Sequence, residues 1–232
     1  MPSAQGVGKF LARGIGPVAA VVAPQAAGGV LRRVLEIAID GRGRVPSARQ
    51  VAAKALERHA GVTDSAIDSI VENHVRLASA QGFVTNLGGL ALLPVSIPAN
   101  LTGVAVLQVR MVAAIAHLRG YDLDDLRVRT ALVMCLLGGE QVARAIDEGR
   151  LPTSPMAVAT APIVDPHLDR RVAEEVTADL VARIGGKNVA VMVTKRVPLV
   201  GGGIGAFLDG TATSQIGRYA KGELVGRRLL NS

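Results

Sequence analysis

The sequence predicts an all-α protein: a multi-helix bundle whose apolar central hairpin is interrupted by glycine and proline. One observation is the spacing of apolar residues, which recur at helical intervals in stretches such as Ile67, Ile70 and Val71. A second is that capping residues precede these stretches and glycines follow them. A third is composition, because 49% of the residues are hydrophobic but only 2% are aromatic. Small aliphatic side chains must therefore fill the core, and they let helices approach closely.

The expected helices in the first half of the chain are marked by their ends. Ser47 and Gln50 have the spacing of a capping box ahead of a helix over 51–59. Thr63 or Asp64 starts the next helix. A long helix is expected from about residue 100 to 118. Its surface is almost entirely apolar, so it should be surrounded by protein or lipid.

The second half predicts further helices over 123–137, 140–148, 168–184, 188–197 and 201–230. Four prolines between residues 150 and 166 predict a linker or a long surface loop there. Asp165 is expected to cap the helix that follows it. The tail is expected to form a glycine-rich apolar helix and then a separate basic one.

Charged residues are absent from three stretches, Gly14–Leu31, Leu77–Val109 and Val197–Leu208. The second has 33 residues, and a membrane span needs about 20. Glycines and prolines interrupt it, so it predicts two shorter helices joined by an elbow. This hairpin either contacts a membrane or forms the buried centre of a bundle. If it contacts lipid, the side chains expected to do so are Phe83, Leu87, Leu90, Leu92, Leu93, Pro94 and Ile97.

Charge and cysteine content restrict the partners and the compartment. Lysine and arginine number 26 against 19 acidic residues, a net charge of +7 that suits anionic membrane surfaces. Nucleic acid is not expected as a partner, because aromatic stacking residues are nearly absent. Cys135 is the only cysteine, which favours the reducing cytoplasm. Arg227 and Arg228 form a basic surface that could aid attachment to the inner face of a membrane.

Several polar residues and closely spaced glycines lie within apolar stretches. An isolated acid such as Asp209 needs a partner if it is buried. One interpretation is an Asp209–arginine pair that holds the bundle together, and another is a polar spot that binds a lipid head group. Gly201 and Gly205, four residues apart, are expected to admit another helix closely. The full predicted polar or packing cluster is Arg110, Arg129, Gly201, Gly205, Asp209, Thr213 and Arg218.

No catalytic, metal or cofactor site is expected. The run Gly201-x-Gly203-x-x-Ala206 imitates a dinucleotide fingerprint but lacks the flanking β-α pattern. None of the four histidines has a partner at metal-ligand spacing. A lipid-modifying enzyme that uses Asp209 is disfavoured, because no pairing of nucleophile and base is visible.

Sequence blocks in a fixed order resemble one bacterial family. They include Gly82-Phe83-Val84-Thr85, Gln108-Val109-Arg110-Met111, Arg129-Thr130 and the stretch from Pro198 to Gly205. Together they resemble the EcsC protein family over roughly residues 30–228. The resemblance implies a mostly helical cytoplasmic protein, with a membrane transport complex as a candidate partner, and no established reaction.

These observations predict a variable segment over 1–30 and an EcsC-like helical domain over 31–232. The leading functional prediction is a non-enzymatic protein that associates peripherally with membrane or anionic lipid. The alternative is a soluble carrier or scaffold for a lipid-like apolar ligand.

Overall fold

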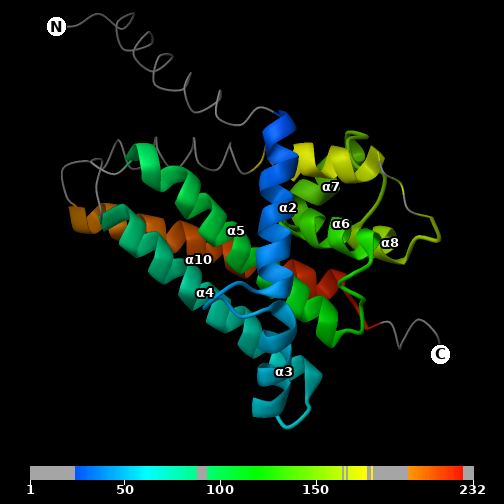
Figure 1. Cartoon of the computed structure of the whole chain (residues 1–232), viewed down its shortest axis with the longest axis horizontal. Coiled ribbons are helices and arrows are strands. Elements are labelled where there is room, and N and C mark those ends of the chain that lie inside the picture. Colours follow the sequence, from blue (N-terminus) through cyan, green and yellow to red (C-terminus); the bar gives the residue numbers. More distant parts are fainter. Residues whose placement is uncertain are drawn as a thin grey trace, which may run out of the picture.

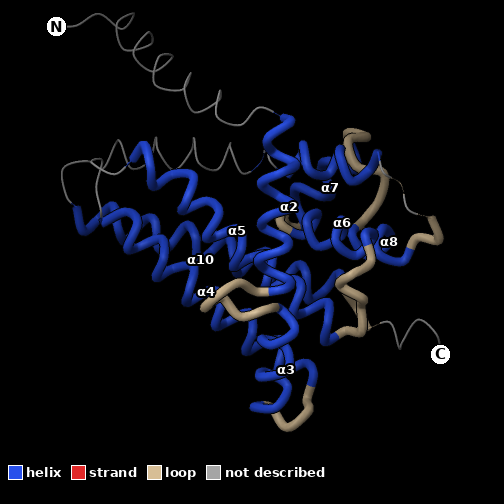
Figure 2. Tube along the Cα trace, in the orientation of Figure 1, coloured by secondary structure: helices blue, strands red, loops and turns tan. Residues whose placement is uncertain are grey.

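The computed structural model describes residues 24–87, 93–163, 165, 167–176, 179 and 198–226. Within these ranges the chain is helical, apart from turns and one isolated bridge between Arg42 and Val45 (Figures 1 and 2). The prediction of an all-α bundle is confirmed. The helices are α2 (Pro24–Asp40), α3 (Ala48–Arg58), α4 (Thr63–Leu87), α5 (Leu93–Leu118), α6 (Leu126–Cys135), α7 (Gly139–Asp147), α8 (Pro155–Thr160) and α10 (Pro198–Glu223). Residues 167–176 are also helical.

The long helices α4, α5 and α10 lie side by side (Figure 1). Gly210 of α10 lies against Ser79 of α4, and Gly217 lies against Val71. Residue numbers therefore rise along α10 as they fall along α4, so these two helices are antiparallel. Gly103 of α5 lies against Gln81 of α4, and Arg110 of α5 bonds to His74 of α4, which gives the same relation between α4 and α5.

Helix α5 supplies the centre of the hydrophobic core. From Val109 to Ala116 every side chain is buried, including those that point in opposite directions around the helix. This is possible because α2, α3, α4, α6 and α10 all pack on α5. The sequence predicted that protein or lipid surrounds this helix. Over residues 109–116 the prediction is confirmed, and the other helices of the protein surround it.

A tight turn and a capping box connect α2 to α3. Gly41 has a φ of +79°, and a side chain on it would come within 2.9 Å of the backbone of Val45 and Ser47. Glycine is favoured at such a position because it has no Cβ. The Ser47 hydroxyl then accepts a hydrogen bond from the Gln50 amide at 3.1 Å, and the Gln50 side chain accepts one from Ser47 at 2.9 Å. The predicted capping box is confirmed.

Replacing Ser47 with alanine is expected to lower the free energy of unfolding by about 1 kcal/mol, because the first turn of α3 loses its side-chain acceptor. Urea unfolding followed by circular dichroism would measure the change. Ser65→Ala, at an exposed position inside α4, is the matched control and should leave stability nearly unchanged. An equal loss in both variants would contradict this role of the cap.

The helices α6, α7 and α8 and residues 167–176 form the remaining part of the bundle (Figure 1). The last turn of α10 attaches to this part, because Glu223 accepts a hydrogen bond from the Met156 amide at 3.0 Å. Met156 lies in the first turn of α8, so Glu223 acts as a cap supplied by another helix. Just beyond α10, the Val225 carbonyl accepts a hydrogen bond from the Tyr121 hydroxyl at 3.0 Å.

Several predicted boundaries were wrong. Helix α5 begins at Leu93 rather than near residue 100, with Pro94 in its first turn, where a proline gives up an N–H that has no helical partner, and with Pro98 in its second turn. The predicted loop over 150–166 contains α8, which Pro155 starts for the same reason. The glycine-rich and basic parts of the tail form one helix through Glu223. The helix predicted over 188–197 lies outside the described residues.

Candidate functional site

A buried polar layer crosses the contact between α4, α5 and α10. It consists of His74, Gln108, Arg110, Asp209 and Thr213, none of which is more than 6% exposed. Gln108 Nε2 donates a hydrogen bond to Thr213 Oγ1 at 3.1 Å and so joins α5 to α10. Arg110 Nε donates to His74 Nε2 at 3.2 Å and joins α5 to α4. These are the polar groups on which a binding function would depend.

The hydrogen bonds of His74 define its protonation state. Its Nε2 accepts from Arg110, so that nitrogen carries no proton. Its Nδ1 lies 2.8 Å from the Ile70 carbonyl oxygen and donates to it. The pKa of His74 is lowered to about 4, chiefly by burial and in addition by the positive charge of Arg110, against the raising effect of the Ile70 carbonyl. The imidazole is therefore neutral at physiological pH.

Arg110 is a buried cation without an acidic partner in the described part of the chain. Its Nε bonds to neutral His74, and within the described residues no carboxylate lies within 4.0 Å of its guanidinium. Burial lowers its pKa below the ordinary arginine value, although not enough to remove the charge at neutral pH. Buried charges in proteins are usually paired, so this arrangement is unusual.

Asp209 and Thr213 lie one turn apart on α10, and both are buried. Asp209 has an interaction of its own. The pairing of Asp209 with an arginine therefore stays a prediction.

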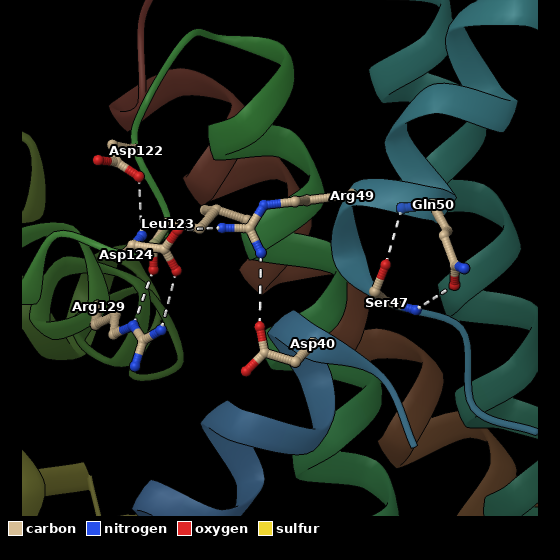
Figure 3. Close-up of polar contacts among 8 residues, drawn as sticks. All are labelled: Asp40, Ser47, Arg49, Gln50, Asp122, Leu123, Asp124 and Arg129. Carbon is tan, nitrogen blue, oxygen red and sulfur yellow. Dashed lines mark hydrogen bonds and ion pairs between the residues drawn. The ribbon is translucent and has the colours of Figure 1, made fainter. Parts of the chain in front are cut away.

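Arg129 and Arg218 lie away from the polar layer. Arg129 Nε donates to the Leu123 carbonyl at 2.8 Å, and its Nη2 approaches Asp124 at 3.3 Å (Figure 3). Arg49 bridges the same Asp124 and Asp40 in an exposed ion-pair network (Figure 3). Such surface pairs add little stability. Arg218 is exposed on α10, so the cluster predicted from sequence is only partly assembled.

Close approach of a neighbouring helix is seen at glycines other than the two that were predicted, and the prediction for those two is untested. Gly201 and Gly205 lie within α10, but their surroundings are outside what the structure describes. The close approaches occur at Gly210 and Gly217. Their seven-residue spacing keeps them on one face of the helix. The seven-residue spacing of Gly210 and Gly217 is the signal in the sequence that indicates this face.

Three charge-free helix segments converge on one end of the bundle. They are residues 82–87 of α4, 93–102 of α5 and 198–208 of α10, and we call them together the charge-free end. The antiparallel packing of α4 with both partners places these segments together, and Figure 1 shows the three helices projecting in the same direction. The segment of α10 is thus brought beside the segments of α4 and α5, although it lies about 100 residues later in the sequence.

Five of the seven residues predicted to contact lipid lie on the helix segments of this region. Phe83 and Leu87 lie on α4, while Leu93, Pro94 and Ile97 lie on α5. Leu90 and Leu92, with the predicted elbow, lie outside the described residues, as do Arg227 and Arg228. In the part of the chain that was searched, no helix combines the length and apolar character needed to cross a membrane.

The described residues offer little to a covalent mechanism. Burial raises the pKa of the Cys135 thiol, and the charge of Glu223 raises it further, so the reactive thiolate is disfavoured. No group of three or more histidine, cysteine or acidic residues that could hold a metal occurs in the described ranges.

The fold and the layer define a class: an all-helical bundle with a buried cationic layer and one charge-free end. The EcsC protein family model matches residues 46–229, and the chain belongs to this family. Helix α2 precedes the matched region and packs on α5 within it. Neither the curated proteins nor the solved structures contain a significant match.

Proposed function

We propose that this protein associates peripherally with a membrane or with anionic lipid through its charge-free end, without catalysing a reaction. The observation that supports this proposal is the convergence of the three charge-free segments of α4, α5 and α10 on one end of the bundle. A bundle end that faces water normally carries charged residues, and this one carries none over 82–102 and 198–208.

The energetics of insertion favour a shallow, surface mode of attachment. Each leucine moved from water into the acyl region contributes about 1.5–3 kcal/mol. Each lysine or arginine near an anionic surface contributes about 1 kcal/mol. The net charge of +7 and basic residues such as Arg227 and Arg228 supply the second term. On this proposal the protein works at the cytoplasmic face of the membrane, with a transport complex as a candidate partner.

Vesicle flotation tests this proposal. The full chain should float with vesicles that contain phosphatidylglycerol and less with neutral phosphatidylcholine vesicles. Changing Leu90 and Leu92 together to aspartate should weaken partitioning at least about a hundredfold, because two insertions of about 1.5 kcal/mol or more are lost.

The matched control is Leu126→Asp, which makes the same change at a leucine that is 62% exposed at the start of α6. This variant should float like the unaltered protein. The proposal is wrong if the unaltered protein does not bind phosphatidylglycerol vesicles at low salt. It is also wrong if the Leu90 and Leu92 double variant binds these vesicles as well as the unaltered protein does.

A second candidate function is a soluble carrier for a lipid-like ligand, and the buried Arg110 favours it. A protein that only docks on a surface has no need of a cation inside its bundle, whereas a carrier can use one to hold an acidic head group. Native mass spectrometry after mild isolation distinguishes the two. A bound lipid of defined mass supports a carrier, and a ligand-free mass together with vesicle binding supports docking alone.

A further inference from the structure

We infer that His74 and Arg110 form an acid-sensitive latch between α4 and α5: a proton taken up by His74 releases α4 from α5 at the polar layer, while the start of α4 stays packed. The change is a local opening of the folded protein. This inference goes beyond the proposed function and does not depend on lipid binding, so the two can fail separately.

Both ring nitrogens of His74 are in use when the latch is closed. Its Nε2 accepts a hydrogen bond from Arg110 Nε at 3.2 Å, and its Nδ1 donates one to the Ile70 carbonyl at 2.8 Å. A proton from water can therefore bind only at Nε2. Nε2 then becomes a donor that faces another donor, so the hydrogen bond between α4 and α5 is lost and two positive charges take its place.

The latch lies where a second positive charge is poorly tolerated. His74 is 3% and Arg110 6% exposed, so little water screens the repulsion between them. Helices α3, α5 and α10 pack on α4, and the buried charged groups that they contribute are Arg110 and Asp209, which lies in the same layer. The other charged or titratable groups of these four helices and their caps are partly or fully exposed: Arg49, Lys54, Glu57, Arg58, His59, Asp64, Asp68, Glu72, Arg76, His117, Arg218, Tyr219, Lys221 and Glu223.

The start of α4 is anchored independently of the latch. Ile67 and Ile70 are no more than 2% exposed. Asp64 also lies 2.8 Å from Arg119, the residue that follows α5. About 15 Å of helix separates Asp64 from His74, so the repulsion at His74 acts well beyond this ion pair. The start of α4 should therefore stay packed when His74 gains a proton.

The part of α4 that follows His74 is held less firmly. Residues 75–81 are all described, and Ala78, a small side chain, is the buried one among them. On this side of the latch, α4 places the polar side chain of Gln81 against Gly103 of α5. A stretch with few buried apolar contacts opens at a lower free energy than the core does. Opening should therefore extend from His74 through Gln81.

The size of the effect follows from two proton affinities. In the closed latch His74 has a pKa of about 4, whereas an imidazole that water reaches titrates near 6.5. Below pH 6.5 the open form binds more protons than the closed form, so the equilibrium constant for opening rises as the pH falls. Between pH 7 and pH 5 this linkage raises the constant about twentyfold.

Amide hydrogen exchange of the full chain, read by mass spectrometry at pH 7 and pH 5, tests the latch. Labelling times are scaled so that an unstructured peptide exchanges equally at both pH values. Exchange in peptides that cover residues 74–81 should then rise about twentyfold at pH 5. Peptides that cover residues 63–70 should change by less than about twofold, because this part of α4 stays packed.

Two substitutions separate the latch from other effects of acid. His74→Gln keeps an acceptor for Arg110 but cannot gain a proton, so the rise over residues 74–81 should disappear. His117→Gln is the matched control. His117 lies in the last turn of α5, and its pKa is also lowered, by partial burial and by the charge of Arg49. This variant should keep the rise over residues 74–81.

A rise that is confined to residues 74–81 and is lost in His74→Gln supports the inference. An equal rise over 63–70 in the unaltered protein overturns it, because acid then opens α4 as a whole. Unchanged exchange over 74–81 overturns it too, as does a fall, which would mean that a carboxylate such as Asp209 stabilises protonated His74. A rise that persists in His74→Gln assigns the effect to another group. The comparison of 63–70 with 74–81 uses the unaltered protein, so it decides even if His74→Gln does not fold.

Discussion

Replacing Gly217 with leucine is expected to lower the free energy of unfolding by about 3 kcal/mol, the upper part of the range for overpacked cores. A Cβ at this position would lie 2.8 Å from Val71 Cγ1 and 3.2 Å from Met111 Sδ. Val71 is β-branched and stiff, so it cannot rotate out of the way at low cost. The leucine side chain would push α10 away from α4 and from α5 together.

Urea unfolding measures this change, and Gly222→Ala on the same helix is the control. Nothing lies within 4 Å of a Cβ at Gly222, so alanine there should stabilise the protein by up to about 1 kcal/mol. Combining Gly217→Leu with Val71→Ala should recover part of the loss, which shows that the two positions are coupled. A stability for Gly217→Leu close to that of the unaltered protein would contradict the close packing of α4 and α10.

A loss of stability on mild acidification is the second large expected effect, and His74 is its source. The unfolded chain binds a proton at this residue near pH 6.5, whereas the folded protein does so only near pH 4. Between these values the unfolded state holds more protons, so a falling pH favours unfolding. The loss reaches about 3 kcal/mol at pH 4, and stability at His74 is fully retained above pH 6.5.

Denaturant unfolding at intervals between pH 7.5 and 5 tests this effect above the main titration of carboxylates. His74→Gln should flatten the profile, and His167→Gln, at an exposed position, should leave it unchanged. His117 contributes a residual slope of the same sign, because partial burial and the charge of Arg49 also lower its pKa. A profile for His74→Gln that is as steep as that of the unaltered protein would show that His74 is not responsible.

The fold was predicted from the sequence where the deciding contacts are local. Ser47 and Gln50 are three residues apart, so their capping box is visible in the sequence alone. The start of α4 at Thr63 was predicted for the same reason. The starts of α5 and α8 were not predicted. The effect of a proline on a helix depends on whether it falls in the first turn, and sequence spacing does not establish where that turn begins.

The polar layer was predicted only in part, because it depends on contacts between distant residues. Arg110, Asp209 and Thr213 stood out as polar residues in apolar stretches. Gln108 was noted only as a polar residue on an apolar helix, and His74 was not predicted to take part, since it looks ordinary within its own helix. Their roles come from pairs separated by 36 residues (His74 with Arg110) and 105 residues (Gln108 with Thr213). Only the packing of α4, α5 and α10 identifies these pairs.

The attachment of α10 also determines when this protein can complete its folding during synthesis on the ribosome. Helix α4 packs on α10, yet the translated chain must reach residue 223 before that partner is whole. Glu223 and Val225 then supply the acceptors for Met156 and Tyr121, which lie 67 and 104 residues earlier. Until those residues emerge, the face of α4 that carries Val71 stays uncovered. The nascent chain is therefore most exposed to aggregation and to chaperone binding in that interval.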